Sequence, residues 1–516
     1  MQSTLLGSLF GFVLTSSFLV QPAIAQSSLF ISYPSNNHET TSDRIFLIGT
    51  APPTGEVTVN GDVISRSSQG HFAPSFPLEM GENRFVIRHE NQETVITVRR
   101  VTETVPTPNG AEFAKGSLMP NVDIARMPGE TVCFSAVAPE NANVAVRVGD
   151  RVISLLPDPN DVTLPANNSV LTGQNDPQPR TIAGRYEGCT QFSQPGSFGA
   201  PQFELQWNGQ TATQAGTGDI TILDRDRFTV AEVTTDGAIA RTGPSTDYSR
   251  LTPLPLGTQA SVTGREGDWL RLDYGAWIRT EEAQTTESGS PPRSTIRSIR
   301  SDRDPNWTRV YFPLQVPVPV EVQQKNDTLT LTLHNTTAQT DFIAFGNNPF
   351  ISAMDWEQVD ANRVQYRFQF AQPQQWGYTL DYEGTTLVLS LRHPPQVGPS
   401  SLAGTTIVID PGHGGPEDLG ARGPDGYPEK DVALRVSQLL RDELERRGAT
   451  VVMTRDTDIE LWLYERTDII AQNEPTIALS VHYNALPDSG DAENTAGVGM
   501  FWYHPHRHGL VAKQVF

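Results

Sequence analysis

The stretch from Thr405 to Ala421, TTIVIDPGHGGPEDLGA, places the strongest constraint on how this chain can fold. The β-branched run from Thr405 to Ile409 stops at Asp410-Pro411-Gly412, which predicts a buried strand followed by a glycine-rich loop. His413 lies in that loop, directly beyond the predicted strand. Because open α/β sheets bind ligands at the carboxyl ends of their strands, the pattern predicts an α/β domain with a site at His413.

The residues that follow continue the α/β pattern. A helix is predicted from Lys430 to Arg447, with Gly448 as its stop signal. Its apolar residues at helical spacing are Val432, Val436, Leu439, Leu440 and Leu444. The other predicted elements are strands over 450–454 and 476–482 and a helix over 461–472. This order predicts a sheet with right-handed crossovers, in which His413 and His482 lie at neighbouring strand ends.

Three side chains are thereby expected to come together: His413, His482 and Glu429, which stands at the start of the first helix. Two imidazoles and a carboxylate are a ligand set of hydrolytic zinc sites, in which the fourth tetrahedral position is left for water. A single histidine is usually structural, and a single glutamate is usually a solvated surface group. Their shared position at element ends favours a Zn²⁺ site.

Length and composition predict that this domain is one of several. With 516 residues the chain exceeds one hydrophobic core, and 39 Pro and 42 Gly among short alternating segments indicate small β domains. The net charge of −21 argues against nucleic acid and an anionic membrane surface as partners. Cys133 and Cys189, in an exported chain, are expected to form a disulfide, the alternative being two buried thiols.

Residues 1–25 are expected to be a secretory signal, because the uncharged apolar segment ends in Ala23-Ile24-Ala25, an Ala-x-Ala cleavage site. No later window is apolar for long enough to span a membrane. The mature protein is therefore expected in the periplasm or outside the cell. The fold class that we predict is multidomain, with tandem small β domains (sandwiches and a barrel) before the α/β domain.

The expected divisions follow shifts in pattern and composition. They are an immunoglobulin-like sandwich over 27–101, a β domain with the cysteines over 114–224, a small barrel over 228–280, a linker over 281–295, a β domain over 296–394, and the α/β domain over 403–516.

Two of these segments resemble known modules. Arg241-Thr242-Gly243-Pro244-Ser245 and the strand Gly267-Asp268-Trp269 resemble the bacterial SH3 family, in which a Gly-x-Trp strand packs into the core of a small barrel. The resemblance implies binding of cell-wall peptides, although Trp269 and Trp277 are expected in the core rather than at a ligand surface. Residues 296–394, placed directly before the α/β domain, resemble the AMIN module, which implies binding of peptidoglycan or other envelope components.

The α/β domain resembles the zinc-dependent N-acetylmuramoyl-L-alanine amidases of the type 3 family. The resemblance rests on Ile409 to Gly415, Gly420-Ala421, Glu429, Thr454-Arg455, Arg466 and Ser480 to Ala485. It implies that His413, Glu429 and His482 are zinc ligands, and that the substrate is the amide between N-acetylmuramic acid and L-alanine in peptidoglycan. An envelope activator protein is a further candidate partner.

The family also has a general-base glutamate on a late strand, and no residue before Phe516 aligns with it. Neither Glu417 nor Glu493 matches that position, so the catalytic base stays unassigned. We interpret the sequence as a truncated amidase domain. A non-catalytic peptidoglycan-binding or regulatory protein is the alternative, since loss of acid-base catalysis costs about 10² to 10⁴-fold in rate.

Overall fold

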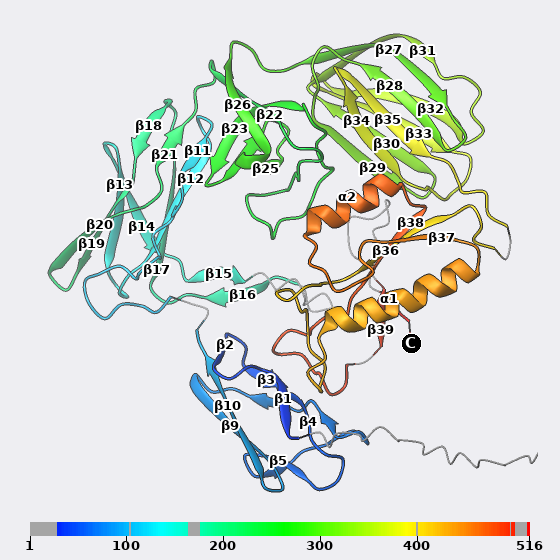
Figure 1. The fold of residues 1–516 in the computed structure, drawn as a ribbon. Helices are drawn as coiled ribbons and strands as arrows, with labels where there is room; N and C mark the ends of the chain where they lie inside the picture. The colour runs from blue at the N-terminus through cyan, green and yellow to red at the C-terminus, as the bar shows by residue number, and fades with distance from the viewer. Residues whose placement is uncertain are drawn as a thin grey trace, which may run out of the picture.

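The computed structural model describes residues 28–102, 105–163, 176–398, 401–495, 497–500 and 513–515. Small β-sheets follow one another along most of the chain, and a three-stranded sheet with two helices lies near its C-terminal end (Figure 1). The expected signal segment, residues 1–25, lies outside the described residues. No helix in the described ranges is both long and apolar enough to cross a bilayer.

The first β region forms two main sheets around a shared core. Their orders are β1-β4-β7 and β2-β10-β9-β5-β6, and β3 pairs with β8. Alternate residues such as Val57, Val59 and Ile87 point into the core, as the period of a strand requires. The strands are β1 (Phe30–Tyr33), β2 (His38–Thr40), β3 (Arg44–Phe46), β4 (Ile48–Thr50), β5 (Val57–Val59), β6 (Asp62–Val63), β7 (His71–Phe72), β8 (Ser75–Pro77), β9 (Gly81–His89) and β10 (Gln92–Arg100).

The second β region contains the disulfide. Cys133 on β12 and Cys189 on β17 are directly opposite each other in an antiparallel pair, and their sulfurs are bonded. The main sheet has the order β12-β17-β14-β13-β19-β20, and β15 pairs with β16. The strands are β11 (Ile124–Arg126), β12 (Thr131–Val137), β13 (Asn143–Val148), β14 (Arg151–Pro157), β15 (Asn160–Thr163), β16 (Gln178–Thr181), β17 (Arg185–Gln191), β18 (Gly196–Gly199), β19 (Gln202–Trp207), β20 (Gln210–Ala215) and β21 (Ile220–Ile222).

The third β region differs from the expected closed barrel. Its strands are β22 (Phe228–Val233), β23 (Gln259–Glu266), β24 (Trp269–Leu272), β25 (Trp277–Arg279) and β26 (Ala283–Ser288). Of these, β22, β23 and β26 join β18, β21 and β11 in the order β18-β21-β11-β23-β22-β26. β24 pairs with β23 and β25, and no barrel closes among the described strands. The reason is that β23 extends beyond β22, so Arg265 and Glu266 pair with β11 instead. Trp269 and Trp277 are buried, as predicted.

Part of the expected linker is a strand. Residues 283–288, within the segment predicted to connect two domains, form β26 and pair antiparallel with the whole of β22. The β-branched pair Thr285-Thr286 suits an extended backbone, and the exposed edge of β22 supplies the hydrogen-bonding partners. Local composition did not reveal this pairing because it depends on a strand about 55 residues earlier in the chain.

The fourth β region is a sandwich of two antiparallel sheets with some parallel pairing, ordered β31-β27-β28-β35-β34 and β29-β30-β33-β32. Fully buried residues such as Phe312, Leu331 and Phe368 fill the space between them. The strands are β27 (Ser294–Arg303), β28 (Trp307–Pro313), β29 (Val320–Lys325), β30 (Thr328–His334), β31 (Thr336–Ala344), β32 (Ile351–Asp360), β33 (Arg363–Phe370), β34 (Tyr378–Glu383) and β35 (Thr386–Arg392).

The C-terminal region has the predicted α/β order. A parallel sheet β37-β36-β38 is accompanied by α1 and α2 (Figure 1). The elements are β36 (Thr406–Pro411), α1 (Glu429–Arg446), β37 (Thr450–Met453), α2 (Leu463–Asn473) and β38 (Ile477–Val481), followed by β39 (Val498–Met500) and β40 (Lys513–Val515). Within α1, Ala433 and Ser437 are buried, whereas Leu439, expected on the apolar face, is 52% exposed.

Candidate metal centre

His413 is positioned by the end of the central strand. β36 ends at Pro411, and Gly412 bonds back to the carbonyl of Val481 on β38 at 2.9 Å. This bond brings the His413 loop against the residue that follows β38, which is His482. A Cβ atom on Gly412 would overlap the His482 ring, so only glycine allows this approach. The predicted proximity of the two strand ends is therefore confirmed.

Glu429 is the first residue of α1, and its carboxylate is held by backbone amides. The Ala421 N–H donates to Oε2 at 2.9 Å, and the Tyr483 N–H donates to Oε1 at 2.6 Å. Burial opposes ionisation of this carboxyl group, but hydrogen bonds from His482, Ala421 and Tyr483 outweigh it and lower its pKa to about 2. The side chain is 4% exposed and ionised at neutral pH.

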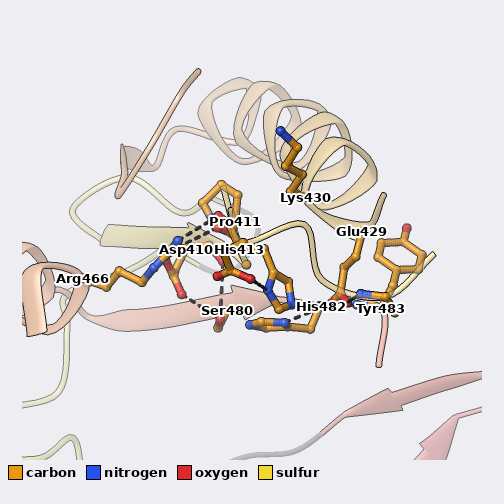
Figure 2. Close-up of polar contacts among 12 residues, drawn as sticks. Asp410, Pro411, His413, Glu429, Lys430, Arg466, Ser480, His482 and Tyr483 are labelled. Atoms are coloured by element: carbon orange, nitrogen blue, oxygen red, sulfur yellow. Dashed lines mark hydrogen bonds and ion pairs between the residues drawn. The ribbon is translucent and has the colours of Figure 1, made fainter. Parts of the chain in front are cut away.

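The three predicted residues converge on one point (Figure 2). Nε2 of His413 lies 3.2 Å from Oε2 of Glu429, and Nδ1 of His482 lies 3.0 Å from Oε1. The candidate ligand atoms all lie within 4.8 Å of one another. The side chains of His413 and His482 are 23% and 39% exposed, so the cluster opens to solvent on the histidine side.

Asp418 contacts the other nitrogen of His413. Its Oδ1 lies 2.6 Å from Nδ1, which leaves Nε2 directed at Glu429. A carboxylate that accepts from the second imidazole nitrogen fixes the tautomer and the ring orientation of a metal-binding histidine. For this role the structure favours Asp418, whose position five residues after His413 was the available signal.

Asp410 has a different environment beneath the loop. Its carboxylate accepts from Thr454 at 2.6 Å, from Arg466 at 2.7 Å and from Ser480 at 2.8 Å. Burial raises the pKa of this carboxyl group, but these three hydrogen bonds and the nearby Arg466 charge lower it below its ordinary value. Asp410 therefore ties β36 to β37, α2 and β38 rather than orienting an imidazole.

Two buried arginines hold the carbonyl groups of the loop, and sequence reasoning assigned them no role. Arg455 donates to the carbonyls of Pro411 and Gly412, and Arg466 donates to those of Pro411 and His413. Arg455 is 2% exposed and also bonds the Lys430 carbonyl in the first turn of α1. The pair fixes the backbone that carries His413 relative to the helix that carries Glu429.

The donor set fits a zinc ion. Two neutral imidazole nitrogens and one ionised carboxylate oxygen can occupy three tetrahedral positions and leave the fourth open, which is the pattern of catalytic rather than structural zinc. The only other group of this kind in the described residues, Cys133, Glu187 and Cys189, includes both sulfurs of the disulfide and so lacks free thiolates.

Comparison with known proteins identifies the C-terminal region. Residues 407–515 match the family model of N-acetylmuramoyl-L-alanine amidases. This region is a type 3 amidase domain. Over 111 residues it is 41% identical to "Probable cell wall amidase LytH" of Staphylococcus aureus, an alignment that covers 21% of this chain and 35% of the relative. The chain thus spans only 35% of the length of that curated relative.

Two solved amidases are similar to part of this chain. The N-acetylmuramoyl-L-alanine amidase AmiC2 of Nostoc punctiforme is 39% identical, with 16% of this chain and 46% of that chain covered and a TM-score of 0.16. The amidase from Clostridium difficile 630 is 31% identical, with 21% and 56% covered and a TM-score of 0.18. Glu417 and Glu493 of the amidase domain are exposed, and neither is assigned as the general base.

Proposed function

We propose that this protein is a zinc-dependent enzyme that hydrolyses the amide bond between N-acetylmuramic acid and L-alanine in peptidoglycan. One observation carries the proposal: His413, Glu429 and His482 converge at adjacent strand ends within the amidase domain. The reaction would serve remodelling of the cell wall or separation of daughter cells.

The residues of the site are suited to hold a metal in a form that can act on an amide. Glu429 is ionised without any metal, because two backbone amides stabilise its charge. Oδ1 of Asp418 faces Nδ1 of His413, and the tautomer with its proton on Nδ1 would present the lone pair of Nε2 to a metal. A zinc ion held there would polarise the scissile carbonyl and lower the pKa of the attacking water towards about 7.

The rest of the chain supports an envelope location. The expected signal over residues 1–25, the SH3-like sequence motifs within 228–280, which form no closed barrel, and the AMIN-like module over 296–394 are together suited to an exported protein that binds peptidoglycan. The acidic chain, with its net charge of −21, suits neither nucleic acid nor an anionic membrane surface. We therefore place the enzyme in the periplasm or outside the cell, with an envelope activator as a candidate partner.

Metal content and wall binding together test this function. The mature protein should bind about one equivalent of zinc, pellet with purified sacculi and release free L-alanine amino groups from them. His413→Ala should abolish zinc binding and release, while Asp442→Asn, an exposed change on α1, should alter neither. Zinc bound equally well by His413→Ala would refute the ligand set. Pelleting without release by zinc-loaded protein would favour the non-catalytic wall-binding alternative.

A further inference from the structure

The first β region, β1 to β10, is called the N-terminal sandwich below. It contacts the amidase domain at two separate points, although more than 350 residues separate the partners in sequence. At the first point Tyr33 donates to the carboxylate of Asp488, and Nε2 of His38 lies 3.0 Å from the same carboxylate. At the second, Nε2 of His71 lies 3.1 Å from Oδ2 of Asp425. The sandwich therefore approaches the amidase domain with three ring side chains directed at two aspartates.

The second contact includes close packing. The Phe30 ring lies against Gly426, where an added Cβ would stand 2.9 Å from the nearest ring atom. Gly426 also has φ +79 in a turn closed by the bond from its N–H to the Gly423 carbonyl at 2.9 Å. A side chain at this position would disturb both the turn and the contact with the sandwich.

Both contacts fall on loops that are attached to candidate metal ligands. Asp425 and Gly426 belong to the loop over 422–428, which ends at Glu429. Asp488 belongs to the loop over 483–491, which begins directly after His482. In Figure 1 the sandwich lies below the amidase domain, with β1 and β4 nearer to that domain than β5. The sandwich thus bridges two loops that are adjacent in sequence to the candidate ligands Glu429 and His482.

The bridge is weak enough to be reversible. The His38 and Asp488 side chains are each 24% exposed, and those of His71 and Asp425 are 34% and 48% exposed. Partly exposed ion pairs of this kind contribute little individually, and solvent screens them. Two such points within one chain can still keep the sandwich docked, because the linked partners remain at high effective concentration.

We propose that the N-terminal sandwich is a reversible cover of the amidase centre: docked on the 422–428 and 483–491 loops, it restricts the approach of peptidoglycan strands, and its release admits them. This inference rests on the proposed function, since the cover is proposed to act on the approach of a polymeric substrate. The partner that the loop surface recognises is this chain's own Tyr33, His38 and His71.

The test uses the mature full-length protein and a release variant, Asp425→Asn together with Asp488→Asn. Neither residue is a candidate ligand. The matched control, Asp442→Asn together with Asp468→Asn, makes the same change in net charge at exposed positions on α1 and α2. Three quantities are compared: hydrogen exchange in residues 30–40, 423–427 and 486–491, the rate of zinc transfer to a chelator, and the rate of release from sacculi.

The release variant should lose protection in all three segments, keep its zinc stoichiometry, and transfer zinc and cleave sacculi about fivefold faster or more, while the control matches the parent. His38→Asp should also release the sandwich, and adding Asp488→His should restore docking. Unchanged exchange, or faster exchange with no gain in zinc transfer and cleavage, would overturn the cover. Absence of zinc binding in the parent itself would instead refute the proposed function, and the cover with it.

Discussion

Oδ1 of Asp418 lies 2.6 Å from Nδ1 of His413, and this contact aims the opposite nitrogen of the ring at Glu429. The loop that carries both residues begins at a strand end and is closed by the bond from the Gly414 N–H to the Asp418 carbonyl at 3.0 Å. The geometry of the candidate metal centre is therefore partly set within six residues of sequence, before any contact with the rest of the domain.

Asp418→Asn should weaken zinc binding about 10- to 100-fold while leaving the fold intact, because the amide no longer stabilises the required tautomer. Zinc affinity is measured by competition with a chromophoric chelator, and the fold by circular dichroism. Glu417→Gln, the adjacent exposed carboxylate, is the control and should keep the parent affinity. Equal affinities for the two variants would show that Asp418 does not orient His413.

Gly420→Ala should impair the centre directly. Gly420 has φ +66, and an added Cβ would lie 2.6 Å from Cδ2 of His413 and 2.8 Å from the Cβ of Glu429. The backbone strain alone costs about 1 to 3 kcal/mol, and relief of the overlap would move the candidate ligands apart. We expect lower stability of the amidase domain and weaker zinc binding, measured by thermal unfolding with and without zinc.

Gly423→Ala provides the comparison for that substitution. An added Cβ at Gly423 would meet its nearest atom, the Tyr427 carbonyl oxygen, at 4.0 Å. This variant should keep both the thermal midpoint and the zinc affinity of the parent. If Gly420→Ala keeps the same thermal midpoint and zinc affinity as Gly423→Ala, then Gly420 does not pack closely against His413 and Glu429.

The buried pair of Arg466 and Asp410 should be costly to break from one side. Arg466→Met leaves the Asp410 charge buried without its cation and removes donors from the Pro411 and His413 carbonyls, so a loss of about 3 to 5 kcal/mol is expected. Hydrogen exchange of the β36 amides measures the loss in the full-length protein. In the double variant with Asp410→Asn, a cost equal to the sum of the single costs would argue against coupling.

The same pair predicts a dependence on pH. The pKa of Asp410 is lowered from its ordinary value of 3.8, so its contribution to stability is complete above that pH and is lost as the pH falls through the folded-state value. The unfolding free energy of the parent should therefore fall more steeply below pH 3.8 than that of Asp410→Asn. Parallel pH profiles would mean that Asp410 titrates alike in the folded and unfolded chains.

The disulfide should stabilise the second β region. Cys133 and Cys189 are 56 residues apart, and a cross-link that closes a loop of this size contributes about 4 kcal/mol in the chain-entropy description. Replacing both cysteines with serine should lower the unfolding free energy of this region by a similar amount, measured by hydrogen exchange of the β12 and β17 amides. The denaturation midpoint should fall as well. Reductant should lower the parent's midpoint but not that of the double variant.

The sequence predicted the α/β elements well because their signals are local. The β-branched run over Thr405 to Ile409 and the helical spacing after Glu429 reflect the burial of each element against a single sheet. The convergence of His413 and His482 followed from parallel strands ending at one edge. Leu439 was predicted on the buried face of α1 but is exposed. The reason is that α1 presents the smaller residues Ala433 and Ser437 to its neighbours.

Long-range contacts could not be predicted in this way. Nothing in the neighbourhood of Arg455 indicates that its side chain is almost fully buried among the carbonyls of a loop 43 residues earlier. The pairing of β11 with β23 and the docking of Tyr33 on Asp488 likewise depend on segments far apart in sequence. Such contacts depend on tertiary packing, which carries no periodic signal.

The cluster of His413, Glu429 and His482 is proposed to serve the cleavage of the amide bond between N-acetylmuramic acid and L-alanine. Mass spectrometry of purified sacculi treated with the zinc-loaded mature protein shows which bond is cleaved. We predict released peptides that begin with a free L-alanine amino group, together with glycan strands whose lactyl carboxylates are free, and no such products from His482→Ala. Cleavage within the glycan or within the peptide, or the same products from His482→Ala, would show that this cluster does not serve the proposed reaction.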